Sequence, residues 1–339
     1  MSTPFSRRSH SRHISYCVGV LVCLVVTAAV GRVAGDEQVF HALSSMMGEW
    51  IGEYHVPAAS AAMMKNGGDI WKLGYGGMSA TDPARIGSLS KAITAVCIAR
   101  LIDDGRLSFT TDVGTVLAPT FEKFGEPADA RFKSVTIEQL LTHRAGLARE
   151  PKPDLQSGDM ATRFERAIAT PLKSDPGGSF SYSNIGYLTL GMIVEAVTGT
   201  DYEQHCRRTA LNPMGVTGFI DPALRHRAPS GGWRISAVDY TKFMQVWEPR
   251  SQMLGARSRN WLEFQRESAP YGLGIYVSRR PRGWRYHHTG YVMSPEPPGR
   301  AIAYKFENGW TVVVIYEGNI SKKSQPALQQ LLSATFLEH

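Results

Sequence analysis

The sequence predicts an α/β (α+β) fold, in which a mixed, mainly antiparallel sheet flanked by helices is assembled from the two ends of the chain. An all-α lobe is inserted between these ends. Two observations lead to this class: strand-like apolar runs gather at 57–76 and 271–316, and helix and loop signals dominate 106–229. When strands from both ends share one sheet, the segment between them has to leave that sheet and return. A cleft between two lobes is therefore expected.

Residues 36–339 are expected to form one folded unit, with the α lobe at about 106–234 between the sheet-forming segments 36–105 and 235–339. Of the 339 residues, 43% are apolar and 20% are charged, a composition that is typical of a globular protein. Residues 1–35 differ in composition and form a separate segment.

A helix, a hairpin and a second helix are expected at the start of the folded unit. Apolar residues three and four positions apart predict the first helix at 39–54. The runs 57–65 and 70–76 are separated by Asn66-Gly67-Gly68-Asp69, and Asn-Gly allows the positive φ of a tight hairpin turn. A long helix over 88–104 then stops at a glycine.

Helices fill the middle of the chain, and strands return near its end. Apolar periodicity predicts helices at 136–142, 160–170, 187–197, 202–211 and 235–247. Short apolar runs joined by turns predict strands at 271–277, 284–288, 300–306 and 310–316. An amphipathic segment at 321–337 predicts a closing helix.

The N-terminal residues 1–35 have the features of an export signal peptide. Arg7, Arg8 and Arg12 precede an apolar run at 14–30, and small residues follow it. The run has about 17 residues, between a long signal peptide and a short membrane anchor in length. We expect an exported protein, periplasmic or extracellular, or one anchored to the membrane through residues 14–30 if this segment stays uncleaved.

Charge and cysteine content exclude several classes of function. Four arginines lie in residues 1–35, so the rest of the chain has 33 basic and 30 acidic residues and a net charge of only +3. No basic stripe with interleaved aromatic residues is present, and we expect no nucleic-acid partner. Cys97 is expected to be a buried thiol. Neither a disulfide framework nor a metal-spaced Cys/His set is visible, so no metal is expected.

The segment Ser88-Leu89-Ser90-Lys91 places a hydroxyl and an amine three residues apart where a helix begins. Side chains at i and i+3 share a face of a helix, so Lys91 can act on the proton of Ser88 and make it a nucleophile. Free N–H groups of the first turn can stabilise an oxyanion there. Chance alone yields roughly one Ser-x-x-Lys in such a chain, so the interpretation depends on further motifs.

A second polar segment, with Tyr182 and Asn184, lies in a loop ahead of a predicted helix. A phenol near Lys91 is expected to ionise more easily and to carry protons, and the amide of Asn184 offers both a donor and an acceptor. The alternative is an exposed tyrosine and a turn-forming asparagine.

A third segment, His288-Thr289-Gly290, ends a predicted strand. Successive side chains of a strand point to opposite faces, so either His287 or His288 can face the cleft, and we choose His288. Gly290 permits a close approach of the backbone, and the N–H of Tyr291 can join that of Ser88 in an oxyanion hole. The alternative is a purely structural histidine.

The three segments together resemble those of the serine β-lactamase and penicillin-binding protein superfamily, in its class C β-lactamase-like branch. This branch also contains D-alanyl-D-alanine carboxypeptidases and esterases. Further segments that are similar to family landmarks, in family order, extend the resemblance over about residues 40–336; they are 104–108, 140–147, 211–215, 231–236 and 271–274. The resemblance implies a β-lactamase/transpeptidase-like fold.

The resemblance also implies roles for these residues. Ser88 is the acylated nucleophile, and Lys91 and Tyr182 move its proton as general acid and base. The groups that bind the substrate are Asn184, which holds the amide of the acyl chain, and His288, Thr289 and Gly290. The implied protein is an exported, monomeric serine hydrolase without a cofactor, which cleaves an amide, β-lactam or ester bond in a small-molecule or peptidoglycan-derived substrate.

Two of the departures from the family pattern bear on the substrate. His288 stands where β-lactamases of this class usually carry lysine, and a mostly neutral imidazole binds a substrate carboxylate less firmly than an ammonium group does. The stretch 291–299 replaces a glycine-rich segment. A dedicated β-lactamase is therefore disfavoured relative to a peptidase or a dedicated esterase. The alternative from another class is a non-catalytic, cell-wall-binding relative.

The same groups predict a pH dependence. Activity is expected to rise with pH as the cluster of Lys91, Tyr182 and His288 titrates.

Overall fold

The structure of the protein is a computed structural model, which describes residues 15–152, 154, 158–268, 270–294 and 296–337. For residues 15–34, 266 and 268 this description covers the backbone alone. The expected signal or anchor segment therefore lies outside the described residues, apart from the backbone of its helical part. Within the described ranges, no helix combines the length and the apolar character that a membrane crossing requires.

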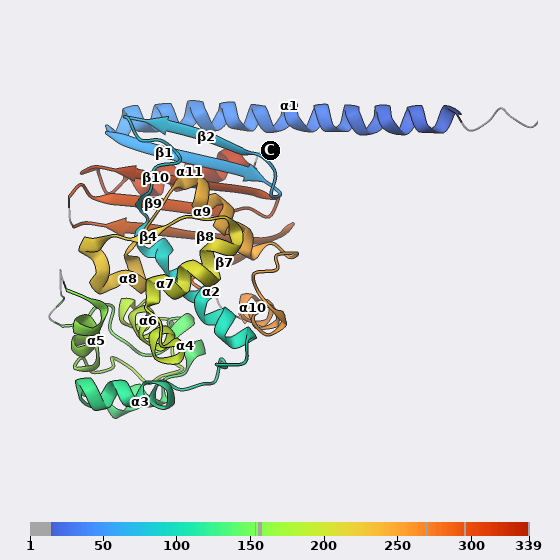
Figure 1. Cartoon of the computed structure of the whole chain (residues 1–339). Coiled ribbons are helices and arrows are strands. Elements are labelled where there is room, and N and C mark those ends of the chain that lie inside the picture. The colour runs from blue at the N-terminus through green and yellow to red at the C-terminus, as the bar shows by residue number, and fades with distance from the viewer. Residues whose placement is uncertain (1–14, 153, 155–157, 269, 295, 338–339) are drawn as a thin grey trace, which may run out of the picture.

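Strands from both ends of the chain form one sheet of seven strands, in the order β2-β1-β10-β9-β8-β7-β6 (Figure 1). They are β1 (Ala58–Lys65), β2 (Ile70–Tyr75), β6 (Tyr271–Gly272), β7 (Ile275–Arg280), β8 (Gly283–Val292), β9 (Gly299–Lys305) and β10 (Trp310–Glu317). β1 pairs with β10 along its whole length and so joins the two ends of the chain. The sheet, expected to be mixed and mainly antiparallel, is antiparallel in every pairing between described strands.

Alternate residues of the central strands face two different hydrophobic cores, because successive side chains of a strand point to opposite faces. On one face, Ala61 and Val314 belong to the core formed with α1 (Ser15–Tyr54) and α11 (Ser324–Leu337). On the other face, Ala62 and Val313 belong to the core that includes α2 (Ser90–Asp103) and α9 (Ala237–Phe243). This second core continues into the helical lobe.

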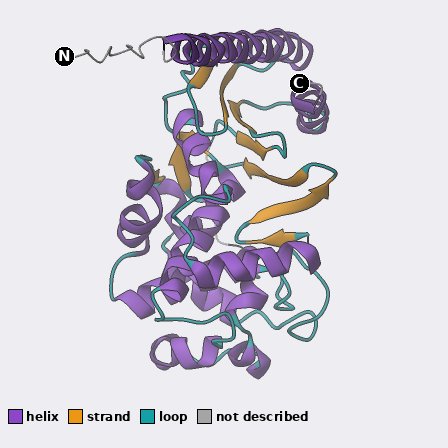
Figure 2. Ribbon diagram, turned by 90° about the vertical axis from the view of Figure 1, so that its right-hand side faces the viewer, coloured by secondary structure: helices purple, strands orange, loops and turns teal. Residues whose placement is uncertain are grey.

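The helical lobe lies at one end of the molecule, and Figure 2 shows most of its helices below the strands. Its helices are α3 (Val113–Phe124), α4 (Ile137–Leu141), α5 (Met160–Ile168), α6 (Asn184–Thr198), α7 (Tyr202–Cys206) and α8 (Ala228–Gly231). α10 (Ala256–Ser268), which the sequence did not predict, follows the lobe in the chain and packs on α2. Short 3-10 or π-helical turns lie at Gly87–Leu89, Ala130–Ser134, Arg207–Leu211, Asn212–Met214, Pro222–Arg227 and Met244–Trp247.

A small second sheet was not expected. It consists of β3 (Ala84–Arg85), β5 (Trp233–Ile235) and β4 (Phe219–Ile220). The inserted lobe is therefore predominantly helical and not all-α. The helix expected from residue 235 begins instead at Ala237, because Ile235 ends β5 and the Ser236 side chain caps the helix by accepting the N–H of Asp239 at 3.0 Å.

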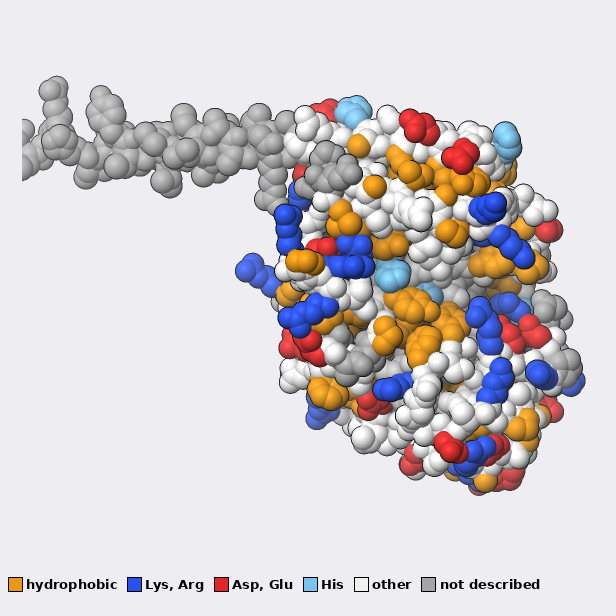
Figure 3. Space-filling view, turned by 180° about the vertical axis from the view of Figure 1, so that it is seen from behind, with side chains coloured by type: hydrophobic (Ala, Val, Ile, Leu, Met, Phe, Trp, Pro, Cys, Tyr) orange, Lys and Arg blue, Asp and Glu red, His pale blue; other side chains and the backbone are white. Residues whose placement is uncertain are grey.

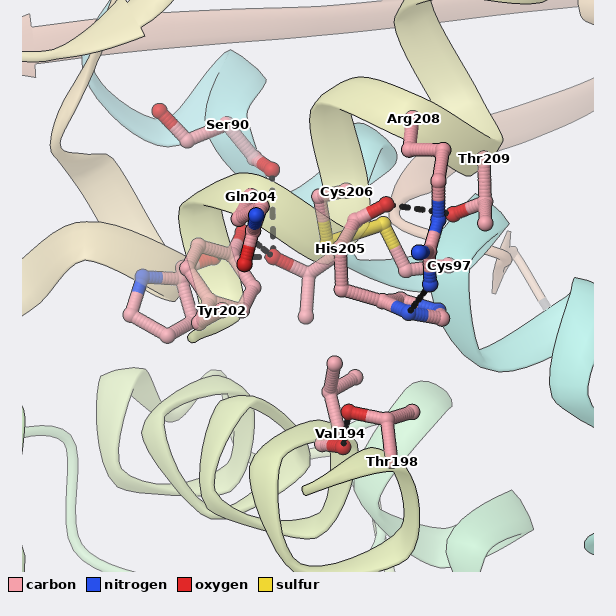
Figure 4. The surroundings of a disulfide bond; sticks show 12 residues. Ser90, Cys97, Val194, Thr198, Tyr202, Gln204, His205, Cys206, Arg208 and Thr209 are labelled. Carbon is pink, nitrogen blue, oxygen red and sulfur yellow. Dashed lines mark hydrogen bonds between the residues drawn. A yellow bond between two sulfur atoms is a disulfide. The ribbon is translucent and has the colours of Figure 1, made fainter. Parts of the chain in front are cut away.

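Cys97 is not the free buried thiol that the sequence suggested. It forms a disulfide with Cys206, 109 positions later, and both residues are fully buried. The bond joins α2 to α7 (Figure 4), whose packing brings the two Cα atoms to 5.5 Å. A single pair at such a separation has no spacing signature, and only the packing of the two helices reveals it.

Candidate active site

Ser88 lies in the 3-10 turn Gly87–Leu89, which leads directly into α2. The amine of Lys91, one turn further on, donates to the Ser88 hydroxyl oxygen at 3.3 Å. The turn needs a glycine before the serine, because Gly87 has φ +52 and a Cβ there would lie 2.5 Å from the N of Tyr291. The spacing of Ser88 and Lys91 thus becomes a direct contact between the hydroxyl and the amine.

Lys91 is fully buried and held by three acceptors. Besides Ser88, its amine donates to the side-chain oxygen of Asn184 and to the backbone oxygen of Ser230, each at 2.6 Å. Burial lowers the pKa of Lys91 well below its ordinary value, and the negative charge of Glu150 opposes this shift. A lysine amine that loses its proton readily can accept the proton of a serine hydroxyl.

Tyr182 lies on the other side of the amine, with its ring centroid 4.9 Å from the Lys91 nitrogen. Burial raises the pKa of Tyr182 above its ordinary value, and a hydrogen bond with the Ser88 side chain only partly opposes this shift. The expectation that this phenol ionises more easily is therefore wrong, because desolvation outweighs the nearby charge. Tyr182 stays protonated and can donate a proton, whereas Lys91 is the group driven towards its neutral form.

Asn184 is the first residue of α6, and both ends of its amide contact protein groups. Its oxygen accepts from Lys91, and its Nδ2 donates to the carboxylate of Glu150. The structure thus places the Asn184 amide oxygen against the Lys91 amine, whereas the resemblance implied a contact with the substrate. Sequence reasoning missed Glu150, which lies just after the 140–147 landmark and in none of the three motifs.

β8 lies directly against the Ser88 turn. A Cβ on Gly290 would lie 1.9 Å from the carbonyl oxygen of Ile86 and 3.2 Å from the N of Ser88, so the position requires glycine. The contacts of Gly87 and Gly290 bring the N–H groups of Ser88 and Tyr291 to neighbouring positions. Two backbone donors at this point fit an oxyanion hole.

His288 lies on the Ser88 side of β8 but is 2% exposed and fully engaged. Its Nδ1 is 2.7 Å from the carbonyl oxygen of Thr289, so Nδ1 carries the proton and Nε2 accepts from the hydroxyl of Tyr271 at 3.1 Å. Burial lowers the pKa of His288 to about 3. His288 is therefore neutral near pH 7, and the expectation that its titration shapes the pH dependence of activity is wrong. Its neighbour His287 stacks instead on Tyr304, at 5.3 Å between ring centroids.

Sequence reasoning also missed the role of His143, although it lies in the 140–147 landmark. Its ring is 4.4 Å from that of Tyr182, between centroids, and its side chain is buried. The N–H of Ser181 donates to the His143 carbonyl oxygen at 2.7 Å, and the N–H of Ser183 donates to Nδ1 at 3.1 Å. His143 therefore accepts the backbone N–H groups of both residues next to Tyr182 in the chain.

An exposed aromatic ring and an exposed cation lie beside Tyr182. Phe180 is 40% exposed, and its ring centroid is 5.6 Å from that of His143. The guanidinium of Arg149 lies 5.1 Å from the ring centroid of Tyr182. Figure 3 shows hydrophobic side chains gathered in the middle of one face, beside histidine atoms and with Lys and Arg on either side. Among the described residues, no group of three or more His, Cys, Asp or Glu side chains is arranged to hold a metal ion.

Comparison with known proteins gives a family and several relatives. The family described as Beta-lactamase matches residues 37–334. Penicillin-binding protein 4 of Amycolatopsis lactamdurans is 34% identical over 189 residues, which cover 52% of this chain and 48% of that protein. Protein flp of Staphylococcus aureus (strain N315) is 31% identical over 236 residues, which cover 62% and 46%. The chain thus spans about half the length of these curated relatives.

Solved structures share the fold at low sequence identity. The D-amino acid amidase of Ochrobactrum anthropi SV3, complexed with L-phenylalanine, has a TM-score of 0.72 at 18% identity, over 89% of this chain and 99% of that one. SurE has a TM-score of 0.71 at 19% identity, over 89% of this chain and 76% of the SurE chain. A D-stereospecific amidohydrolase from Streptomyces sp. has a TM-score of 0.69 at 18% identity, over 89% and 98%.

Proposed function

The chain belongs to the beta-lactamase family, and from this premise we propose that it is a serine hydrolase that cleaves an amide or ester bond through an acyl-enzyme on Ser88. The observation that carries the proposal is the buried Lys91 amine, 3.3 Å from the Ser88 hydroxyl and held there by the side chain of Asn184. Burial favours the neutral amine, which is the form that can accept a proton.

The proposed reaction has two steps. Neutral Lys91 takes the proton of the Ser88 hydroxyl as the serine oxygen attacks the carbonyl carbon, and the N–H groups of Ser88 and Tyr291 stabilise the negative oxygen. The hydroxyl of Tyr182 protonates the leaving amine or alkoxide. Lys91 then passes the proton that it took from Ser88 to Tyr182, so both groups regain their starting states. Water then attacks the acyl-enzyme by the same proton transfers in reverse and frees Ser88.

The state of His288 bears on the substrate. A neutral, buried imidazole that is bonded to Tyr271 offers no positive charge to a substrate carboxylate. Penicillins and peptides ending in a free carboxylate are therefore disfavoured. The exposed ring of Phe180, which packs on His143 beside Tyr182, suits a hydrophobic side chain of a substrate. Two proteins of this fold are named a D-amino acid amidase and a D-stereospecific amidohydrolase. We place hydrophobic D-amino acid amides first among the candidate substrates.

The disulfide supports the proposal that the protein is exported. Disulfides persist in oxidising compartments and are rare in the cytosol. Together with the basic and apolar N-terminal segment, the Cys97–Cys206 bond favours a periplasmic or extracellular protein, either released or held by that segment.

A substrate panel on the full chain and on Ser88→Ala tests the proposal. The panel contains D- and L-phenylalanine amide, a D-Ala-D-Ala peptide, benzylpenicillin and a nitrophenyl ester, with a fluorophosphonate as a covalent probe. We expect turnover of the D-amide, a mass adduct on Ser88, and a loss of kcat/KM of about 1,000-fold or more in the variant. Peptidoglycan binding that Ser88→Ala leaves unchanged, without an adduct or turnover in the wild type, would favour the non-catalytic relative instead.

A further inference from the structure

We infer that Glu150 is a positioning residue of this site, which orients the amide of Asn184 and places a negative charge next to Lys91. This inference rests on the proposed function, because it concerns the group that takes the proton of Ser88. Glu150 lies in the loop between α4 and α5, outside the three motifs.

The orientation of the Asn184 amide follows from its two neighbours. Nδ2 donates to Oε1 of Glu150, and Oδ1 accepts from the amine of Lys91 at 2.6 Å. If the amide were rotated by 180°, its NH2 group would face the amine of Lys91, which is also a donor. Its oxygen would face the carboxylate of Glu150, which is also an acceptor. The carboxylate therefore decides that Asn184 presents its oxygen to the base.

The carboxylate itself is held in place. Oε2 of Glu150 accepts from the guanidinium of Arg163 at 2.6 Å, and Arg163 is 1% exposed. The Glu150 loop is tied to the start of α6, because the N–H of Asn184 donates to the carbonyl oxygen of Arg149 at 2.8 Å. A hydroxyl bond from Ser183 to the carbonyl oxygen of Ala148, at 2.6 Å, adds to this tie. Because Glu150 is held in this way, it can keep the Asn184 amide within the narrow range of positions and angles that catalysis requires.

The charge of Glu150 matters because of the other groups that face Lys91. They are the rings of Tyr182 and Tyr187, the imidazoles of His143 and His288, the guanidinium groups of Arg149 and Arg227, and the carboxylate of Glu150. Burial lowers the pKa of both histidines and raises the pKa of both tyrosines, so these four are neutral near pH 7. The two arginines lower the pKa of Lys91 and Glu150 raises it. Without Glu150, Lys91 would become neutral at a lower pH.

Two substitutions separate charge from geometry. Glu150→Gln keeps an acceptor for Asn184 and removes the charge, so the acid limb of the kcat/KM profile is expected to move to lower pH by about 0.5–1 unit. Glu150→Asp keeps the charge and shortens the side chain, so this limb stays in place while kcat/KM falls by about 10-fold or more. The matched control is Glu138→Gln in α4, whose carboxylate accepts from Gln265 and whose loss leaves the profile unchanged.

The profiles are measured with the best substrate and with the rate of the fluorophosphonate adduct, on variants whose melting curves show a folded protein. If Glu150 served only to pair with Arg163, its replacement would change the melting temperature of the protein but not the position of the acid limb. Superimposable profiles of Glu150→Gln and wild type therefore overturn the inference alone. If Glu150→Gln fails to fold, wild-type kcat/KM in Glu150→Asp overturns it. A wild-type chain that forms no adduct overturns the proposed function and the inference together.

Discussion

At the scale of single residues, several buried side chains of the site contact Lys91 and Tyr182 and hold them in position. His143 is one of them, because it accepts the N–H of Ser183, contacts the ring of Tyr182, and has a buried side chain. Burial lowers the pKa of His143 well below its ordinary value, so its Nδ1 remains an acceptor at neutral pH. His143 also adopts φ +58, a left-handed conformation that asparagine tolerates better than most residues.

Replacing His143 is expected to slow the reaction by displacing Tyr182. His143→Phe keeps a ring but loses the acceptor, so kcat should fall by about 10–100-fold with a smaller change in KM. His143→Asn restores an acceptor at a tolerated φ and should recover part of the loss. Steady-state kinetics and melting curves test this, with His41→Phe on α1, whose side chain is 72% exposed, as the matched control. Wild-type kcat in His143→Phe would contradict the role.

At the scale of elements, α2 is the part on which the site depends most. It carries Lys91 and is tied to the helical lobe by the disulfide to α7. Near this bond, the hydroxyls of Thr94 and Tyr202 are 2.7 Å apart, and Trp233 donates to the Tyr202 hydroxyl at 3.1 Å. Figure 4 shows Tyr202 and Cys206 on the segment that packs beside α2. These links fix α2, and with it Lys91, between the sheet and the helical lobe.

Removal of the disulfide is expected to lower stability more than activity. A closed loop of this length contributes about 5 kcal/mol to the free energy of unfolding in the chain-entropy account. Cys97→Ala/Cys206→Ala should therefore unfold at lower urea concentration than the wild type and keep its Ser88 adduct under native conditions. With a reductant present, the urea midpoint of the wild-type protein should approach that of the variant. Equal unfolding midpoints for the variant and the oxidised wild type would show that the bond adds nothing.

At the scale of the whole molecule, folding buries neutral histidines on both faces of β8: His288 lies beside Tyr182 with His143, and His287 lies against Tyr304. Burial lowers the pKa of His287 to about 4 and of His288 to about 3, and it lowers the pKa of His143 as well. In the unfolded chain these side chains bind a proton near pH 6.5. Between that pH and the lower pKa values of the folded state, the unfolded chain binds more protons than the folded protein does. The stability of the folded protein therefore rises with pH in this window.

The melting temperature is accordingly expected to fall as the solution is acidified. The free energy contributed by the neutral histidines is fully present above about pH 6.5 and is lost progressively below it, so the melting temperature at pH 5 should be about 5 °C or more below that at pH 7.5. Melting curves between these values, at constant ionic strength, measure the effect. His288→Gln should flatten the dependence. A melting temperature that stays constant or rises on acidification would contradict this account.

Much of the fold was predictable, because its signals are local. The hairpin of β1 and β2, the helix after Ser88 and the C-terminal strands follow from turn chemistry and apolar spacing, and the structure confirms them. The short strands β3, β4 and β5 were missed, since two or three residues carry no period. The disulfide was missed because nothing in the sequence says which helices become neighbours.

The sequence by itself determined the placing of the Ser88 hydroxyl and the Lys91 amine at i and i+3, the polar loop around Tyr182, and the glycine that lets β8 approach the Ser88 turn. Each of these depends on spacing along the chain or on one residue type. Only the tertiary structure decided the protonation of the side chains in the site, because burial makes His288 neutral and keeps Tyr182 protonated. It also decided that Glu150 contacts Asn184. The physical reason is that desolvation and charge act through space, among groups that folding brings together from distant parts of the chain.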